Sequence, residues 1–537
     1  MLTSQNSNYS RFASESEIKS SLYKVNLEGD IPQYGGIPLF TETGAVYVEP
    51  TDTHSLIIGS TGSKKTRLVG MPALRLYALA GESFVVTDPK AELYEKTFPL
   101  LKNHDYKIFV LNLRDPMHSN AWNPLIVPYH LYHSGQRDKA IELVNDMANC
   151  IVKADYARDP YWQNSAADML AGLLFVLFEC AQNNEINFKS LRVLRTQALR
   201  IIEDNIPFIQ ENFLKHLDSA SFVYSLLSGT VEVCHETRGC IVSVFDQALR
   251  PFFSQDNLID MLSANNLDMG KIGKEKTAVF LIIPDENTLY HRLISVFVKQ
   301  CYTELIIEAQ KQPSKLLPRR VNFLLDEFSS LPQINDFPAM ITASRSRNIR
   351  FNLFVQSIHQ LRDRYGGHAE TIRGNCENWV FLHSRELSLL EELASLSGKR
   401  NHEDSLVSVS MLQTLDKDKG EAFILHKRKH PYIANLPDID SYPDITPKGM
   451  LTDYPKNSCK AEAVFDFHLF CRKNSEFFLS KLFTGKTHDE IRNISREEQE
   501  RYYMSDDDDV IVEPIFTSTI PDSDKLEEIY RRTDVST

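Results

Sequence analysis

The stretch GSTGSKKT, residues 59–66, carries residue types that bind phosphate groups. In the pattern G-x-x-x-x-G-K-S/T, backbone N–H groups at a helix N-terminus point at the anion. The lysine reaches the β- and γ-phosphates, and the hydroxyl ligates Mg²⁺. Lys65 and Thr66 hold the last two positions, whereas Lys64 stands where the pattern has its second glycine. We therefore expect a nucleotide-binding loop made of Gly59, Ser60, Thr61, Gly62, Ser63, Lys64, Lys65 and Thr66.

A second candidate is the acidic pair in VNFLLDEF, where Asp326 and Glu327 follow a run of mostly apolar residues. Asp326 would hold Mg²⁺, directly or through water, and Glu327 would be the general base that activates the attacking water. Alone, such a pair could equally cap a strand end. Because it follows the phosphate-binding loop by about 260 residues, with a helical stretch between, it predicts the hydrolytic half of an ATP site.

Asp88 and Lys90 lie in the motif DPK directly after another apolar run. A carboxylate at the carboxyl end of a strand in an α/β sheet lies where ligands bind. The Asp-Pro dipeptide also favours an ordinary turn, so both interpretations stay open.

The stretch TASRSRNIRFNLFVQS places three arginines ahead of an apolar run and Gln356 at its end. Gln356 could sense the γ-phosphate, and one arginine could act as a finger on the nucleotide of a neighbouring subunit. Exposed arginines are usually solvated surface residues, which is the competing interpretation.

Short apolar runs, typical of buried parallel strands, predict the elements that position these residues. Apolar residues at helical spacing in LVGMPALRLYALA (68–80) predict a helix after the glycine loop. Strand, glycine loop, helix and strand in succession predict an α/β nucleotide-binding fold. A hairpin is expected at residues 37–50, with its turn at Thr43 and Gly44. The predicted sheet strands are residues 54–59, 84–90, 107–113, 278–285, 321–328, 349–357, 378–384 and 420–426.

From residue 155 to about 250 the pattern changes to helical periods without a convincing strand, which predicts an all-helical insertion. Residues beyond 453 are irregular and charged. The predicted domains are a polar, disordered N-terminal segment (1–30), the first part of the nucleotide-binding domain (31–154), the all-α insertion (155–252), the second part of the nucleotide-binding domain (253–453) and a C-terminal extension with an acidic tail (454–537).

The formal charge of −13 is distributed unevenly along the chain. Ser505 to Thr537 hold ten acidic and three basic residues, a net of −7, which leaves −6 for the rest. Contact with nucleic acid would therefore depend on a local basic patch or pore. The acidic tail is either a solvated terminus or a docking segment for basic partners, and we favour the former.

Cysteine usage and hydropathy indicate an intracellular chain. The eight cysteines form no C-x-x-C pair, so we expect reduced thiols and neither a disulfide framework nor a zinc ribbon. The N-terminus has no apolar region typical of a signal peptide. The most apolar run, residues 169–180, is too short to span a bilayer, so we expect a cytoplasmic protein without a transmembrane segment.

Together these motifs resemble the type IV coupling proteins, the TraG-type ATPases of conjugative DNA transfer and type IV secretion. The resemblance covers residues 34–443, and DPK-x-E-L-Y-E followed by a W-N-P-L box is its most distinctive part. The resembling stretches include YGGIPLF, HSLIIGSTGSKKT, FVVTDPKAELYEKT, VLNLRDPMHSNAWNPL, YWQNSAADML, FLIIPDE, FLLDEFSSLP, TASRSRNI, VQSIHQL, NCENWVFLHS and KGEAFILHKRKHPYIANLPD.

The resemblance implies a RecA-like P-loop nucleotide-binding domain with an inserted all-α domain. It implies ATP and Mg²⁺ as cofactors and a hexameric ring that moves single-stranded DNA, with an attached relaxase, to a secretion channel. The implied partners are relaxosome proteins, channel ATPases and membrane components. The residue roles that it implies are nucleotide binding for Lys65 and Thr66, metal binding for Thr66 and Asp326, hydrolysis for Asp326 and Glu327, proximity to the site for Asp88 and Lys90, a finger for Arg345 and a sensor for Gln356.

Two departures from the family pattern keep alternatives open. Many members begin with transmembrane helices, which we do not find here, so a membrane partner would recruit this chain to the inner face of the membrane. Lys64 replaces a glycine where the backbone lies against the β-phosphate, which questions hydrolysis more than the fold. The alternatives to the ATPase are a docking adaptor deficient in hydrolysis and a related hexameric DNA pump outside conjugation.

Overall fold

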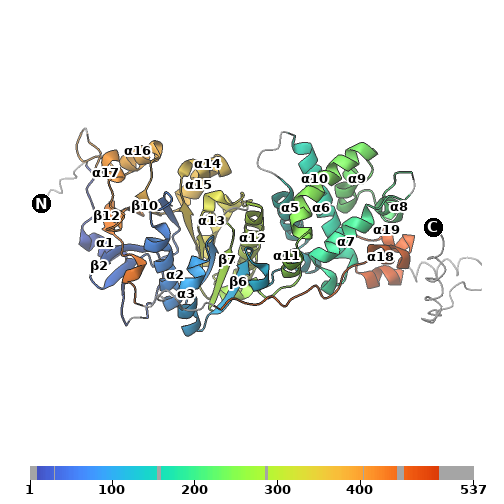
Figure 1. Cartoon of the computed structure of the whole chain (residues 1–537), viewed down its shortest axis with the longest axis horizontal. Helices are drawn as coiled ribbons and strands as arrows, with labels where there is room; N and C mark the ends of the chain where they lie inside the picture. The colour runs from blue at the N-terminus through green and yellow to red at the C-terminus, as the bar shows by residue number, and fades with distance from the viewer. Residues whose placement is uncertain are drawn as a thin grey trace, which may run out of the picture. The chain divides into compact units, whose positions relative to one another are not determined.

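The computed structural model describes residues 9–29, 31–153, 159–202, 204–284, 288–402, 404–443 and 453–494. The chain divides into two units, residues 1–473 and 474–537. The first unit contains a nine-stranded sheet, a three-stranded sheet and a block of helices (Figure 1). In the second unit the structure describes residues up to 494, among them α19 (Glu476–Ser480). The predicted acidic tail lies outside the described residues.

The nine-stranded sheet is built from the apolar runs of the sequence. Its strand order is β12-β11-β10-β4-β9-β8-β5-β7-β6, with parallel pairing from β10 to β6 and antiparallel pairing of β11 and β12 at one edge. All eight predicted strands are present, and β12 is additional. The strands are β4 (Ser55–Gly59), β5 (Ser83–Asp88), β6 (Lys107–Asn112), β7 (Thr277–Ile282), β8 (Val321–Leu325), β9 (Ile349–Val355), β10 (Asn378–His383), β11 (Glu421–His426) and β12 (Tyr432–Asn435).

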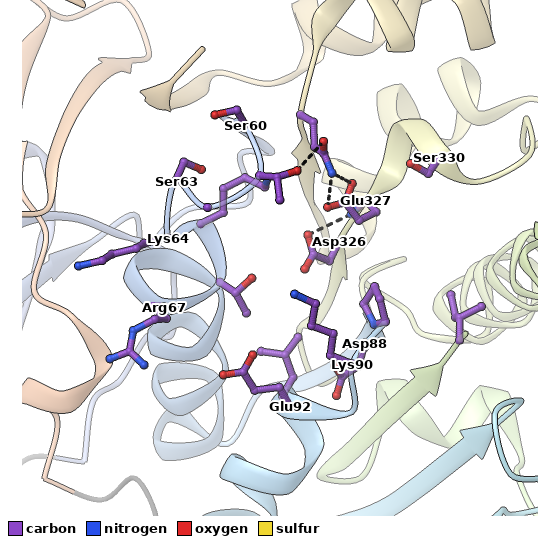
Figure 2. Close-up of a pocket in the computed structure, with 18 of the residues that line it drawn as sticks. Ser60, Ser63, Lys64, Arg67, Asp88, Lys90, Glu92, Asp326, Glu327 and Ser330 are labelled. Atoms are coloured by element: carbon purple, nitrogen blue, oxygen red, sulfur yellow. Dashed lines mark hydrogen bonds between the residues drawn. The ribbon is translucent and has the colours of Figure 1, made fainter. Parts of the chain in front are cut away.

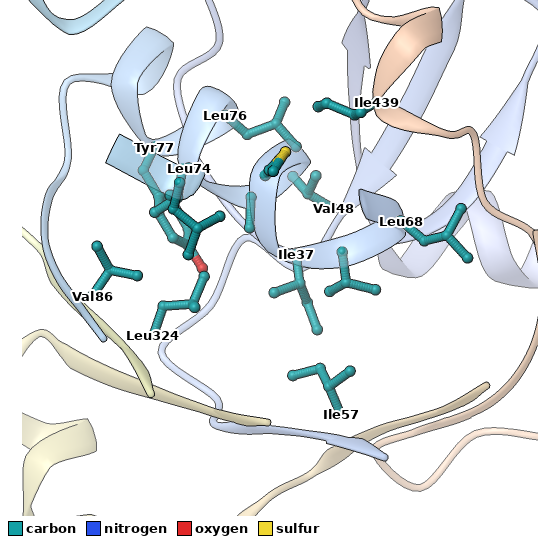
Figure 3. Packing of buried hydrophobic residues seen from close by; sticks show 14 of the residues in the cluster. Ile37, Val48, Ile57, Leu68, Leu74, Leu76, Tyr77, Val86, Leu324 and Ile439 are labelled. Carbon is teal, nitrogen blue, oxygen red and sulfur yellow. The ribbon is translucent and has the colours of Figure 1, made fainter. Parts of the chain in front are cut away.

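Apolar side chains cover both faces of this sheet because successive residues of a strand point to opposite sides. On one face, Ile57, Val86 and Leu324 pack beneath helix α2 (Met71–Ala80), as Figure 3 shows. On the other face, Phe323 of β8 stacks on Phe351 of β9, with ring centres 4.9 Å apart. The parallel strands are thus buried on both sides, which explains their nearly continuous apolar sequences.

The remaining helices outside the helical block connect successive strands, except α1, which precedes the first strand. They are α1 (Glu15–Ser21), α3 (Glu92–Asn103), α12 (Thr288–Lys311), α13 (Phe337–Ser344), α14 (Ile358–Tyr365), α15 (His368–Asn375), α16 (Leu387–Leu396) and α17 (Val409–Gln413).

The prediction that residues 1–30 are disordered is wrong for residues 9–29. Ser14 caps helix α1 in a capping box with Glu17, which satisfies backbone donors that a polar segment would otherwise expose to water. The following strand β1 (Tyr23–Asn26) pairs with β3 (Ala45–Val48). β3 also pairs with β2 (Pro38–Glu42), which confirms the predicted hairpin. Strand β1 therefore adds to the hairpin, and this pairing orders the N-terminal segment.

The helical block between β6 and β7 is all-helical in its described residues, apart from one isolated bridge between Ile201 and Pro207. Helix α6, which carries the most apolar run of the chain, packs against α5, α7, α9 and α10. Among the described residues, no helix has the length and apolar character needed to cross a bilayer. The helices are α4 (Ile126–His133), α5 (Arg137–Val152), α6 (Pro160–Cys180), α7 (Phe188–Ala198), α8 (Phe208–Asn212), α9 (Phe222–Val231), α10 (His235–Phe253) and α11 (Asp256–Met261).

Helix α5 begins before the predicted insertion boundary at residue 155, yet it packs against α6. The segment after residue 453 is also more regular than the sequence indicates. It binds α7, since Asn187 donates to the carbonyl of Ala463 (2.8 Å) and Ser190 accepts from the N–H of Phe465 (2.9 Å). It then forms α18 (Phe467–Lys473). A C-terminal segment therefore completes the helical block.

A buried ionic cluster joins strands at the amino edge of the sheet. Arg350, at the start of β9, has a side chain only 3% exposed and pairs with Glu82 (2.7 Å). Glu82 also accepts from Arg320 (3.2 Å) and from the amide of Asn322 (2.8 Å). Charges taken out of water must be paired and hydrogen-bonded, and here a single carboxylate pairs with two guanidinium groups.

We expect Glu82→Ala to lower the free energy of unfolding by about 3–5 kcal/mol, because it leaves the buried Arg350 guanidinium without its carboxylate partner. The matched control is Glu42→Ala, since Glu42 also pairs with two cations, Lys19 (2.8 Å) and Lys24 (2.5 Å), but on the surface. Urea unfolding followed by circular dichroism measures both variants. Equal midpoints for the two would contradict the role assigned to the cluster.

Candidate active site

A cavity of about 480 Å³ opens at the carboxyl edge of the parallel strands. The ends of β4, β9, β8 and β5 all contribute to it, because parallel strands end on the same side of a sheet. Of the residues predicted from the sequence, those that line it are Ser60, Thr61, Gly62, Ser63, Lys64, Lys65, Thr66, Asp88, Lys90, Asp326, Glu327 and Gln356. Gly59 lies at the start of the same loop, at the end of β4.

The loop after β4 has the backbone of a phosphate cradle. A Cβ at Gly59 would collide with the hydroxyl of Ser63, and Gly62 has a φ of +79°, which favours glycine. Ser60 anchors the loop to the neighbouring strand β10, because its N–H donates to the carbonyl of His383 (2.9 Å). Its hydroxyl also lies 2.9 Å from the His383 ring Nδ1.

Lys64 adopts a backbone conformation that favours glycine. Its φ is +64°, in the left-handed region that glycine adopts without steric cost. Its side chain runs away from Asp326 and Glu327, as Figure 2 shows. The Lys64 ammonium pairs with Asp418 (3.1 Å) and lies 3.8 Å from Asp438. The extra side chain therefore lies outside the space that faces the acidic pair.

Two buried polar groups of the loop are suited to an anion. The Ser63 hydroxyl is buried and has no hydrogen-bond partner among the described residues. The Lys65 amine is buried and donates to the carbonyl of Gly59. Burial lowers the pKa of Lys65, while the charges of Glu327 and Asp326 raise it. A phosphate group at the loop would satisfy the hydroxyl and compensate the amine.

Gln356, at the end of β9, joins the loop to the acidic pair at the end of β8. Its amide nitrogen donates to both carboxylate oxygens of Glu327 (2.8 Å each), and its carbonyl accepts from Thr61 (3.1 Å). Glu327 has a φ of +54°, an uncommon conformation for a residue with a side chain. The N–H of Glu327 donates to Asp326 (3.0 Å). These contacts, drawn in Figure 2, fix the direction of the Glu327 carboxylate.

Asp88 and Asp326 are two buried carboxylic acids that line the cavity. Burial raises the pKa of Asp326 to about 6, and the charge of Glu327 adds to this effect. Burial likewise raises the pKa of Asp88 to about 7, although the N–H of Tyr94 donates to it (2.8 Å) and opposes the shift. Lys90 follows Asp88 and extends from the β5–α3 turn into the cavity (Figure 2). The DPK motif therefore serves both as a turn that caps α3 and as part of the site.

The structure places Arg345 away from the cavity. It precedes β9, whose far end carries Gln356, so about seven residues of strand, roughly 23 Å, separate the two ends. Arg345 pairs with Glu377 and its side chain is 53% exposed. Within one chain it cannot reach the site. Arg350, another arginine of the same stretch, is excluded as a finger because it is buried against Glu82.

Several residues of the site were missed from the sequence. His383 ends an apolar run beside the loop strand, and that position was a usable signal. Arg67 directly follows Thr66, lines the cavity and pairs with Asp438 and Asp440. His291 lines the cavity from α12, and no pattern in the sequence marked it.

A family model described as type IV secretory system conjugative DNA transfer matches residues 7–417 of the chain. Among curated protein sequences, none matches significantly. The structure is similar to that of the plasmid coupling protein TrwB in complex with the ATP analogue ADPNP. That likeness has 16% identity and a TM-score of 0.58, and it covers 84% of this chain and 99% of that one.

A second structure of TrwB, in complex with ADP and Mg²⁺, is similar with 16% identity and a TM-score of 0.56. The similarity covers 81% of this chain and 94% of that chain. At this level of identity the likeness concerns the fold. It confirms the predicted fold class, a RecA-like P-loop domain with inserted helices.

We expect Asp326→Asn to gain stability relative to the native chain as the pH rises. The pKa of Asp326 is about 6 in the folded chain against an ordinary 3.8, so the folded state keeps a proton that the unfolded state releases. Folding is therefore disfavoured as the pH rises towards 6, and the difference between the two chains grows by about 1.3 kcal/mol from pH 5 to pH 7.

Urea unfolding without divalent cations measures this difference. Glu42→Gln is the control, because its pKa of about 2 lies below the range tested. A difference that stays constant from pH 5 to pH 7 would refute the assignment of a protonated Asp326.

Proposed function

The chain belongs to the type IV secretory system conjugative DNA transfer family, and we propose that it is the coupling protein of such a system, an ATPase that drives single-stranded DNA with an attached relaxase to the secretion channel. One observation carries the enzymatic part of this proposal. Lys65, Asp326 and Glu327, from distant parts of the sequence, line one cavity, and Gln356 joins the loop to the base.

Hydrolysis would use these groups as follows. Lys65 and the loop N–H groups bind the phosphates of ATP and stabilise the charge that develops on them. Glu327 accepts a proton from water as the water oxygen attacks the γ-phosphorus, and the bond from the γ-phosphorus to the β–γ bridging oxygen breaks. ADP and inorganic phosphate are the products. Gln356 must exchange at least one of its contacts with Glu327 for the nucleotide, which makes it a sensor of the γ-phosphate.

The residues present fit a magnesium ion. Hard oxygen ligands suit Mg²⁺, and the Thr66 hydroxyl and the Asp326 carboxylate are the candidates at this edge. The ion would neutralise the charge of the β- and γ-phosphates. The raised pKa of Asp326 supports this role, because a cation offsets the cost of burying its charge.

The geometry at Lys64 supports the ATPase over the docking adaptor. The adaptor hypothesis depends on a side chain that obstructs the phosphates, but Lys64 has the backbone conformation of glycine and pairs with Asp418 instead. The third hypothesis, a DNA pump outside conjugation, has no specific observation in its favour.

The remaining parts of the proposal concern assembly and partners. The distance of Arg345 from the cavity of its own chain supports a finger that acts on a neighbouring subunit, as in a hexameric ring. Relaxosome proteins, channel ATPases and a membrane component that recruits the chain to the cell membrane are the proposed partners.

We expect the native chain to hydrolyse ATP in the presence of single-stranded DNA. Glu327→Gln should lower kcat by about 10²–10⁴-fold, because the general base is lost, while ATP binding persists. Lys64→Gly should change kcat by less than about threefold. Glycine adopts the same backbone conformation, and the side chain that is removed points away from Asp326 and Glu327 (Figure 2). A native rate equal to that of Glu327→Gln, together with a rate revived by Lys64→Gly, would establish the adaptor instead.

We expect Arg345→Ala and Lys65→Ala to be inactive separately and to complement one another when mixed. A mixed ring contains interfaces with an intact Lys65 on one subunit and an intact Arg345 on the next. In equal mixtures about a quarter of the interfaces are competent, so ATP turnover should recover to that order. Full activity of Arg345→Ala on its own would refute the finger.

A further inference from the structure

His291 is a buried polar side chain that the proposed chemistry does not use. It lies near the start of α12 and is 8% exposed. Neither ring nitrogen has a hydrogen-bond partner among the described residues. Buried polar groups in folded proteins are nearly always paired, so both ring nitrogens are available to a polar partner in the cavity that the ring lines.

The cavity that holds the phosphate-binding loop is also the one that His291 lines. Its position follows from the strand order, in which β4, β9, β8, β5 and β7 lie side by side. The loop follows β4, the acidic pair follows β8, and α12 follows β7. His291 therefore belongs to the side of the cavity beyond the acidic pair, where Ile283, Ser330 and Leu331 also line it.

The chemistry of this region favours a phosphate oxygen as the missing partner. An imidazole ring offers one donor and one acceptor when neutral and two donors when protonated. A nucleotide held by Lys65 directs its terminal phosphate at the acidic pair, and the space beyond the pair is where that phosphate or its product would extend. Lys90 lines the same cavity and supplies positive charge.

The residue next to His291 contacts the helical block. The Arg292 guanidinium donates to the carbonyl of Ile151 (2.5 Å), and the thiol of Cys150 donates to the carbonyl of Arg292 (3.4 Å). Both partners lie on α5. One turn of α12 thus faces the cavity through His291 and the helical insertion through Arg292.

We propose that His291 forms a subsite that hydrogen-bonds an oxygen of the terminal phosphate, either within ATP or after its release as inorganic phosphate. This inference rests on the proposed ATPase function. In this proposal His291 is a ligand-binding residue near the point where the phosphate is cleaved. It lies on α12, the helix that contacts α5.

Nucleotide titrations of the full chain test the subsite. His291→Phe keeps a ring of similar size and removes both nitrogens, and His291→Gln restores a donor and an acceptor. We expect His291→Phe to weaken ADPNP binding about tenfold or more and ADP binding less than twofold, because only ADPNP carries the terminal phosphate. His291→Gln should recover part of the loss.

A second titration distinguishes the terminal phosphate of bound ATP from released inorganic phosphate. Titration of inorganic phosphate into the ADP complex should show about tenfold weaker binding for His291→Phe if the subsite holds the released product. An unchanged phosphate affinity, with weakened ADPNP, would restrict the subsite to bound ATP. Tyr290→Phe is the matched control, since the neighbouring Tyr290 bonds to Gln255 (3.1 Å) and leaves the cavity unchanged.

Thermal melting verifies that each variant is folded. Equal losses of ADPNP and ADP affinity in His291→Phe would overturn the proposal, because they would indicate a packing role. Unchanged affinities for ADPNP and for phosphate would overturn it as well. If the native chain binds no nucleotide, the proposed function fails first and the subsite fails with it.

Discussion

The hydrogen bonds of Gln356 are the interaction on which the candidate active site depends. β9 lies between β4 and β8, so a side chain at its end reaches the phosphate-binding loop on one side and Glu327 on the other. The Gln356 amide holds the carboxylate of Glu327, the proposed general base. A γ-phosphate that competes for this amide would release Glu327 towards water, which ties activation of the base to the presence of substrate.

The other end of the same strand is held by the buried pair of Arg350 and Glu82. β9 is therefore anchored by ionic contacts at its amino end and by the hydrogen bonds of Gln356 at its carboxyl end. Apolar packing on both faces keeps water from the strand between them. A rigid central strand suits a site that must keep loop and base within hydrogen-bonding distance.

Burial shifts the pKa values of the ionisable groups in the cavity towards their neutral forms. Asp88 and Asp326 have raised pKa values because they are buried, and the buried amine of Lys65 has a lowered pKa for the same reason. A nucleotide with its cation would supply the missing countercharges. The proposed contact of His291 adds a hydrogen-bonding group on the side of the cavity beyond the acidic pair, on the helix that meets the helical block.

The sequence by itself determined the strands, the helical insertion, the phosphate-binding loop and the acidic pair, because apolar period and short motifs are local properties of the chain. It could not determine that Lys64 has a left-handed φ and turns to Asp418, that the strand starting at Tyr23 pairs with β3, or that His291 lines the cavity. Those features depend on contacts that are distant in the sequence, such as the pairing of Lys64 with Asp418 or of strand β1 with the β2–β3 hairpin. Only tertiary structure brings such partners together, because long-range packing and not local spacing decides which polar groups are buried and paired.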